Sequence, residues 1–297
     1  MNTVATDTPY VPGTKPENYD GPVDRTDLRD DVLDRVLDRF GFSGRPEPTR
    51  ETLDEVVKQW SRQVGYDNVL KRIYLVERQT GAFPSQDPNE FFGNWLEHGV
   101  AAGCWPSAEA MFGVLHKLGF QVSRIAGTMI EVPDPMRPAH GALDVRIDGR
   151  RFRADPSLGA EAALELVAGE RTAQDSPAHG IWSEGNDIVC WYPGHMRKPL
   201  STVFWLEDLS PAFFAYRNEA TKAFSIFNHS LYVRKNRDGG VLTFGRGHLI
   251  RVDPQGELTA DPVDPADVPQ LLVDEFGLSE EIAARVPVAD DEGASFQ

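Results

Sequence analysis

Apolar residues in the first third of the chain recur at the i, i+3, i+4 and i+7 spacing of an amphipathic helix. Each of these stretches carries at least one signal of a helix end. The signal is a capping residue or a proline at its start, or a glycine just after it. The predicted helices are one capped by Thr26 and ended by Gly41, one over residues 50–64, one beginning at Asp87-Pro88, and one from Cys104 to Gly119. This pattern predicts an all-helical N-terminal third.

From Phe120 the spacing of apolar positions changes to two, which is typical of strands. Turns rich in proline and glycine separate the alternating stretches. The predicted strands lie near residues 121–131, 141–147, 150–155, 187–192 and 202–206, with a short helix over 160–170. Beyond Ser210 the pattern mixes both periods. It predicts a helix over 211–220, strands near 230–235, 240–244 and 246–252, and helices about 265–276 and 279–286.

The order of these elements predicts three folded domains after a flexible arm. Residues 1–25 are polar and carry four prolines, so they are expected to form the arm. The three domains then cover residues 26–119, which are helical, 120–209, which are rich in strands, and 210–297, which are mixed. The whole chain is therefore assigned to the α+β class.

Cys104 occupies the first position of the helix that ends at Gly119. Pro106 fits the first turn, where its missing N–H removes no intrahelical bond. A cysteine at this place meets the positive end of the helix dipole, which favours the nucleophilic thiolate over the thiol. We therefore take Cys104 as the candidate nucleophile. Cys190, in an apolar stretch, is predicted to be an ordinary core residue.

The second group of candidate residues lies on a predicted β-hairpin. Asp148-Gly149 is a strong signal for a two-residue type I′ turn. With this turn as the loop, the register pairs Ile147 with Arg150, Val145 with Phe152 and Ala142 with Asp155. His140 and Asp155 then share the polar face of the hairpin, diagonal to each other. A carboxylate beside an imidazole fixes its tautomer and stabilises the imidazolium, so the pair is the candidate base for Cys104.

These three residues resemble the active-site residues of the arylamine N-acetyltransferases. In that family a cysteine opens a helix, a histidine follows about forty residues later, and an aspartate comes fifteen residues after the histidine. Here the steps are 36 and 15 residues. The resemblance extends from about residue 30 to about 280. Segments 211–228, 231–234 and 274–277 fall where the family has related segments.

The chain departs from the family pattern around both catalytic motifs. Residues 100–104 read Val-Ala-Ala-Gly-Cys where the family has Arg-Gly-Gly-aromatic-Cys, and Pro106 replaces a glutamate. Residues 155–159 read Asp-Pro-Ser-Leu-Gly where the family has Asp-Val-Gly-Phe-Gly. The resemblance implies an N-terminal helical bundle, a central antiparallel β-barrel carrying His140 and Asp155, and a C-terminal α/β lid. These surround a papain-like or transglutaminase-like Cys-His-Asp core.

The resemblance also implies an N-acyltransferase with a ping-pong mechanism. Cys104 would take an acyl group from a thioester, and a small-molecule amine would then attack the thioester intermediate to form an amide bond. His140 would accept the thiol proton and later assist the amine, while Asp155 orients it. The Cys104 N–H is a candidate oxyanion donor. Acetyl-CoA is the implied co-substrate, and no permanently bound cofactor is expected.

Three other functions remain open at this point. One is an amide synthase of natural-product biosynthesis that takes its acyl group from an acyl carrier protein. Another is an amide or thioester hydrolase of the transglutaminase and papain-like group, with water as the acceptor. The third is a degenerate family member that binds a partner without catalysis. No basic cluster marks a phosphate site for a CoA donor. The candidate phosphate partners are Arg234, Lys235, Arg237 and Arg246.

Composition narrows the list of partners and compartments. The net charge of −16 argues against a nucleic acid or an anionic membrane as partner. No apolar run approaches 18 residues, and the first residues lack the pattern of a signal peptide. Two cysteines do not make a disulfide framework, so a cytoplasmic protein is expected. No metal-ligand spacing or glycine-rich phosphate loop occurs, and no metal site is expected.

Overall fold

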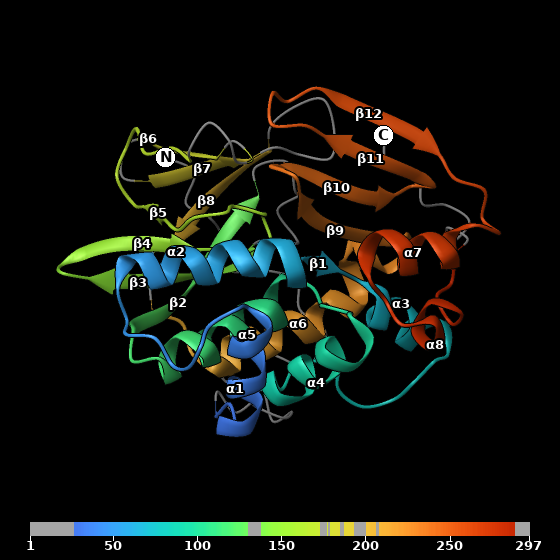
Figure 1. Ribbon diagram of the computed structural model, residues 1–297, viewed down its shortest axis with the longest axis horizontal. Coiled ribbons are helices and arrows are strands. Elements are labelled where there is room, and N and C mark those ends of the chain that lie inside the picture. Colours follow the sequence, from blue (N-terminus) through green and yellow to red (C-terminus); the bar gives the residue numbers. More distant parts are fainter. Residues whose placement is uncertain are drawn as a thin grey trace.

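The computed structural model describes residues 27–129, 138–172, 177, 179–184, 187–192, 200–205 and 208–288. Helices lie along one side of the molecule, and two antiparallel sheets lie beside each other above them (Figure 1). The α+β class expected from the sequence is confirmed. The expected arm over residues 1–25 and the expected cap Thr26 lie outside the described residues. The expected domain limits remain a prediction.

The N-terminal helices follow the apolar periodicity closely. They are α1 (Asp30–Arg39), α2 (Arg50–Gln59), α3 (Val69–Val76), α4 (Pro88–His98) and α5 (Cys104–Lys117). α2 continues through a π-helical turn, Trp60–Val64, and Gly65 ends it at a positive φ of 73°. Asp87 caps α4 by accepting a hydrogen bond from the N–H of Asn89, as the Asp-Pro pair predicts. The apolar faces of α1, α2, α4 and α5 pack into the main hydrophobic core.

The expectation of an all-helical N-terminal third was wrong in one place. Strand β1 (Tyr66–Asp67) lies between α2 and α3 and pairs with β9 (Tyr232–Arg237) of the C-terminal sheet. Two residues are too few to show strand periodicity. Their backbone conformation is set by pairing with β9, in which Tyr66 faces Arg234, 168 residues further along the chain. The segment that follows, α3, was also not predicted.

The first sheet has seven strands and curls strongly (Figure 1). Its order is β5-β4-β3-β2-β8-β7-β6. The strands are β2 (Gln121–Met129), β3 (His140–Ile147), β4 (Arg150–Ala154), β5 (Leu164–Glu165), β6 (Gly180–Glu184), β7 (Asp187–Tyr192) and β8 (Leu200–Trp205). The expected helix over 160–170 was wrong, because β5 pairs there with β4, Leu164 opposite Arg153. Pairing with a neighbouring strand overrides the weak local helix preference.

The hairpin that carries the candidate histidine has the predicted register. Ile147 faces Arg150, and Val145 faces Phe152. Asp148 and Gly149 both have positive φ, 51° and 76°, as a type I′ turn requires.

The second sheet and the last helices form the C-terminal part of the molecule. The sheet order is β1-β9-β10-β11-β12, with β10 (Gly240–Gly245), β11 (His248–Val252) and β12 (Leu258–Pro262). Before it come α6 (Pro211–Phe224) and a 3₁₀ turn, Ile226–Asn228. After it come α7 (Val268–Phe276) and α8 (Glu280–Ala283), and one sheet face packs with them into a separate apolar cluster.

Two close contacts set the first sheet against the helices at the place where β3 begins. At Gly141 an ideal Cβ would lie 2.7 Å from the ring of Trp105 and 3.0 Å from that of Phe214. A residue with a side chain has no room there, so glycine lets β3 approach both α5 and α6. The start of α5 is thereby held beside His140, the neighbour of Gly141.

Candidate active site

Cys104 is the first residue of α5, and Gly103 precedes the helix without a side-chain cap. The first N–H groups of a helix have no intrahelical partner, so the Cys104 N–H is available to an oxygen beside the sulfur. The side chain is partly buried, and its Sγ lies 3.7 Å from the carbonyl oxygen of Ala139. That carbonyl belongs to the residue before His140. The thiol therefore lies at the start of β3.

His140 and Asp155 contact each other directly. Nε2 of His140 lies 2.7 Å from Oδ2 of Asp155, and both side chains are almost completely buried. The other carboxylate oxygen, Oδ1, accepts hydrogen bonds from the N–H groups of Ser157 and Leu158 at 3.0 and 3.2 Å. The turn after β4 therefore fixes the carboxylate, and the carboxylate fixes the imidazole. The sulfur of Cys104 is close enough to His140 to help raise the pKa of the imidazole.

The electrostatics of this group favour an ion pair. Burial by itself would lower the pKa of His140, but the Asp155 carboxylate and the Cys104 sulfur outweigh it and raise the pKa to about 10. Burial would likewise raise the pKa of Asp155. The charges of His140 and Arg153 and the Ser157 N–H outweigh it, so this pKa falls to about 2. At neutral pH the imidazole is therefore protonated and the carboxylate ionised.

A second buried cation stands beside the carboxylate. Arg153 is fully buried, and its Nη1 lies 3.8 Å from Oδ2 of Asp155. Within the described residues none of its guanidinium nitrogens makes a hydrogen bond, and the group lies over the ring of Phe204 at 5.4 Å. The same ring packs edge-on against His140. Burial and the nearby Arg153 charge lower the pKa of His179 to about 4, so that histidine is neutral.

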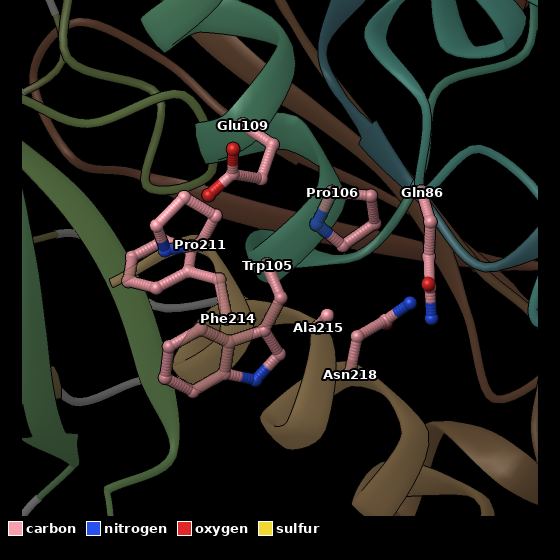
Figure 2. A pocket seen from close by; sticks show the side chains of 8 residues that line it. All are labelled: Gln86, Trp105, Pro106, Glu109, Pro211, Phe214, Ala215 and Asn218. Atoms are coloured by element: carbon pink, nitrogen blue, oxygen red, sulfur yellow. The ribbon is translucent and has the colours of Figure 1, made fainter. Parts of the chain in front are cut away.

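A small pocket lies between α5 and α6, with Trp105 in its wall. Figure 2 shows Trp105, Pro106 and Glu109 from α5 facing residues of α6, with Gln86 at one end. The α6 residues that line it are Pro211, Phe214, Ala215 and Asn218. Trp105 follows Cys104 in the chain, so the pocket wall includes the neighbour of the candidate nucleophile. Its walls are mostly apolar, with a few amide and carboxylate groups, and its cavity volume of about 10 Å³ has room for about one water molecule.

A family model described as N-acetyltransferase matches residues 49–285, which is most of the chain and includes all three candidate residues. The chain belongs to the arylamine N-acetyltransferase family. It is therefore an acyltransferase, as expected from the resemblance of its Cys, His and Asp spacing. A comparison with curated proteins finds no match.

Solved arylamine N-acetyltransferase structures share the fold. The enzyme from Nocardia farcinica superposes with a TM-score of 0.74 at 19% identity, covering 89% of this chain and 96% of that one. The Salmonella typhimurium enzyme gives 0.70 at 20% identity, covering 86% and 98%. A Mycobacterium marinum enzyme in complex with CoA gives 0.70 at 18% identity, covering 84% and 96%. The similarity therefore extends over almost the full length of these relatives.

Two cations of this protein that lie near the Cys104 thiol were not predicted from the sequence. Burial lowers the pKa of Lys71 on α3 to about 7, and the Cys104 sulfur partly offsets the lowering. Burial also lowers the pKa of Arg217 on α6, again with Cys104 acting in the opposite direction. No spacing in the sequence brings α3 and α6 together. The sequence signal available was the aromatic-rich stretch 211–228, which contains Arg217.

Other sequence expectations have simple structural outcomes. Of the candidate phosphate partners, Lys235 donates to the Phe276 carbonyl and Arg237 pairs with Glu275. Cys190 lies in β7, but the surroundings of its side chain fall outside the described residues. In the described ranges no three His, Cys, Asp or Glu side chains gather as a metal site would require. No helix in the part of the chain that the structure describes is long and apolar enough to cross a membrane.

Proposed function

We propose that this chain is an N-acyltransferase that moves an acyl group from acyl-CoA to an amine through a thioester on Cys104. The observation that carries the proposal is the buried pair of His140 and Asp155, 2.7 Å apart, with the Cys104 sulfur at the start of the same strand. Such an arrangement activates a nucleophile and holds its base in one orientation. Within this proposal the two sheets supply the expected central barrel and C-terminal lid around a papain-like core.

Acylation begins from the thiolate of Cys104 and the imidazolium of His140. The sulfur attacks the thioester carbonyl, and the C–S bond to CoA breaks as the bond to Cys104 forms. His140 gives its proton to the departing CoA thiolate. The helix N-terminus supplies the Cys104 N–H to the oxyanion, where a fixed donor stabilises the developing charge. The product of this half-reaction is an acyl-enzyme and free CoA.

Deacylation uses the same residues in reverse. The amine attacks the acyl carbon, neutral His140 takes its proton, and the Cys104 thiolate leaves as the amide forms. The Asp155 carboxylate stabilises the imidazolium in both half-reactions. The donor side is supported by the Mycobacterium marinum relative, whose structure is a complex with CoA. The family itself supports an arylamine as acceptor.

The test is a turnover assay with acetyl-CoA as donor and an arylamine such as 4-anisidine as acceptor. The proposal predicts amide formation by the wild-type protein and none by Cys104→Ala. Cys104 is partly buried at a helix start, so the smaller side chain leaves the fold intact, and an unchanged circular dichroism spectrum is the control. Amide formation at the wild-type rate by Cys104→Ala would overturn the covalent mechanism. CoA release at the same rate with and without the amine would identify a hydrolase instead.

A further inference from the structure

Lys71 is held in place against helix α6. Its helix, α3, is anchored at its start because the Asn68 side chain bonds the carbonyls of Phe227 and Ser230. The Lys71 ammonium is directed across to α6, where Nζ lies 3.0 Å from Oγ1 of Thr221. It also lies over the ring of Phe83 at 5.3 Å. These contacts fix the charge in a partly buried place rather than in open solvent.

The face of α6 that meets Lys71 also carries two other donors. Arg217 is 3% exposed, and its guanidinium lies over the Trp105 ring at 5.9 Å. Asn218 is 8% exposed, and its Nδ2 has no hydrogen-bond partner within the described residues. Asn218 lines the pocket beside Trp105 (Figure 2). Thr221 donates to the Asn218 carbonyl at 2.6 Å, so the hydroxyl that Lys71 contacts lies one helical turn from Asn218.

The carboxylates near this place already have partners. Glu219 accepts hydrogen bonds from the Phe83 N–H and Gln86 and forms an ion pair with Lys222. Glu109, in the pocket wall, is bound by both guanidinium arms of Arg124. In the described part of the chain no carboxylate pairs with Lys71. A desolvated cation without an anion is costly, and an anionic ligand would remove that cost.

We propose that Lys71, Arg217 and Asn218 form an anion subsite beside Cys104, which selects a substrate carrying a carboxylate. The inference rests on the acyl transfer proposed above and names the substrate class for that same site. A carboxylate matches these donors because one oxygen accepts from the guanidinium while the other accepts from the ammonium and the amide. Arg217 lies over the ring of Trp105, the residue after Cys104, and the Cys104 sulfur acts on the pKa values of both cations, so the carboxylate would lie near the reacting atoms.

The positive charge of this local arrangement contrasts with the overall negative charge of the protein. With a net charge of −16, the molecule as a whole repels anions. Two cations at the same stretch of α6, Lys71 and Arg217, are therefore not a by-product of a basic surface. The carboxylate belongs either to the acyl group or to the amine, and matched substrates separate the two sources.

The experiment compares kcat/KM for substrate pairs that differ in one charge. The acceptor pair is 4-aminobenzoate and 4-aminobenzamide with acetyl-CoA, and the donor pair is succinyl-CoA and butyryl-CoA with one fixed arylamine. Wild type is expected to prefer the carboxylate in one pair by ~10-fold or more, as a site built for polar recognition does. Lys71→Met should reduce that ratio to within about twofold of unity, and Lys71→Arg should restore most of it.

Lys222→Met is the matched control. Lys222 also lies over the Phe83 ring, at 4.8 Å, but it is paired with Glu219 and bonds the Gly81 carbonyl. This variant should keep the wild-type ratio. The proposal is overturned by a wild-type ratio near one for both pairs. It is also overturned if Lys71→Met slows charged and neutral substrates equally, because Lys71 would then act on the thiol alone. In either case, an acyl group detected on Cys104 would leave the proposed acyl transfer valid. If no thioester acylated Cys104, both the acyl transfer and the anion subsite would be excluded.

Discussion

At the scale of single residues, the site holds one buried carboxylate between two buried cations. Asp155 is ionised, and His140 and Arg153 are positive, so the carboxylate offsets one of the two positive charges. A thiolate on Cys104, which the proposed mechanism requires, would offset the other. A balanced group is less costly to bury than an unbalanced one. The carboxylate therefore stays ionised at a place with almost no contact with water.

Replacing Asp155 by Asn should slow the acylation of Cys104 by ~10² or more, because an amide has no charge to stabilise the imidazolium and can hold the wrong tautomer. The measurement is single-turnover release of CoA after mixing with acetyl-CoA. Asp144→Asn is the control, since Asp144 is a buried aspartate on the same hairpin that pairs with Arg151 instead. An acylation rate in Asp155→Asn equal to that of Asp144→Asn would exclude Asp155 from the chemistry.

The same pair makes stability depend on pH in a defined window. The folded-state pKa of His140 is raised to about 10, so its contribution is complete below about pH 6.5 and is lost as the pH rises toward 10. The pKa of Asp155 is lowered to about 2, so its contribution is complete above about pH 4 and is lost as the pH falls toward 2. The difference in melting temperature between wild type and Asp155→Asn should therefore be largest between pH 4 and 6.5. A difference that does not change between pH 5 and 9 would contradict this account.

At the scale of elements, the site depends on how closely β3 approaches α5 and α6. Gly141→Ala should lower the free energy of unfolding by ~1–3 kcal/mol, because the new methyl group overlaps the buried rings of Trp105 and Phe214. Gly93→Ala is the matched control. Gly93 lies inside α4 with nothing near its missing Cβ, so alanine should stabilise by up to ~1 kcal/mol. Urea unfolding measures the free energy of unfolding of both variants. Equal changes in the two variants would contradict the close contact at Gly141.

The elements also show which parts of the fold can be predicted from sequence. Local signals sufficed for the helices with apolar stripes and for the hairpin at Asp148-Gly149. β1 was missed because two residues carry no period, and β12 because its residues are mostly exposed and lack an apolar face. The segment at 160–170 was assigned wrongly because its pairing partner, β4, determines its structure. Lys71 was missed as a site residue because burial, which sets its pKa, depends on helices distant in sequence.

At the scale of the whole molecule, one buried carboxylate ties the C-terminal sheet to the segment just before α5. Asp67 of β1 accepts hydrogen bonds from the Ala101 N–H at 2.6 Å and the Val69 N–H at 2.9 Å. Asp67→Asn should lower the free energy of unfolding by ~1–3 kcal/mol, because the amide NH₂ meets one of these donors and leaves it unsatisfied. It should also change the rate at which iodoacetamide alkylates Cys104.

The control for Asp67 is Asp274→Asn at an exposed position on α7, which should stay within ~0.5 kcal/mol of wild type. Thermal unfolding and alkylation rates are measured on both variants. If Asp67→Asn and Asp274→Asn had the same stability and the same alkylation rate, the hydrogen bonds of Asp67 would not stabilise the fold.

The central claim is that the reaction passes through an acyl group on Cys104. The direct measurement is peptide mass spectrometry of protein mixed with acetyl-CoA without an amine and quenched in acid within seconds. The account predicts an added acetyl group on the peptide containing Cys104, none on the peptide containing Cys190, and loss of the label when an arylamine is added before the quench. Amide formation in the complete reaction with no label on Cys104 at any time would contradict it.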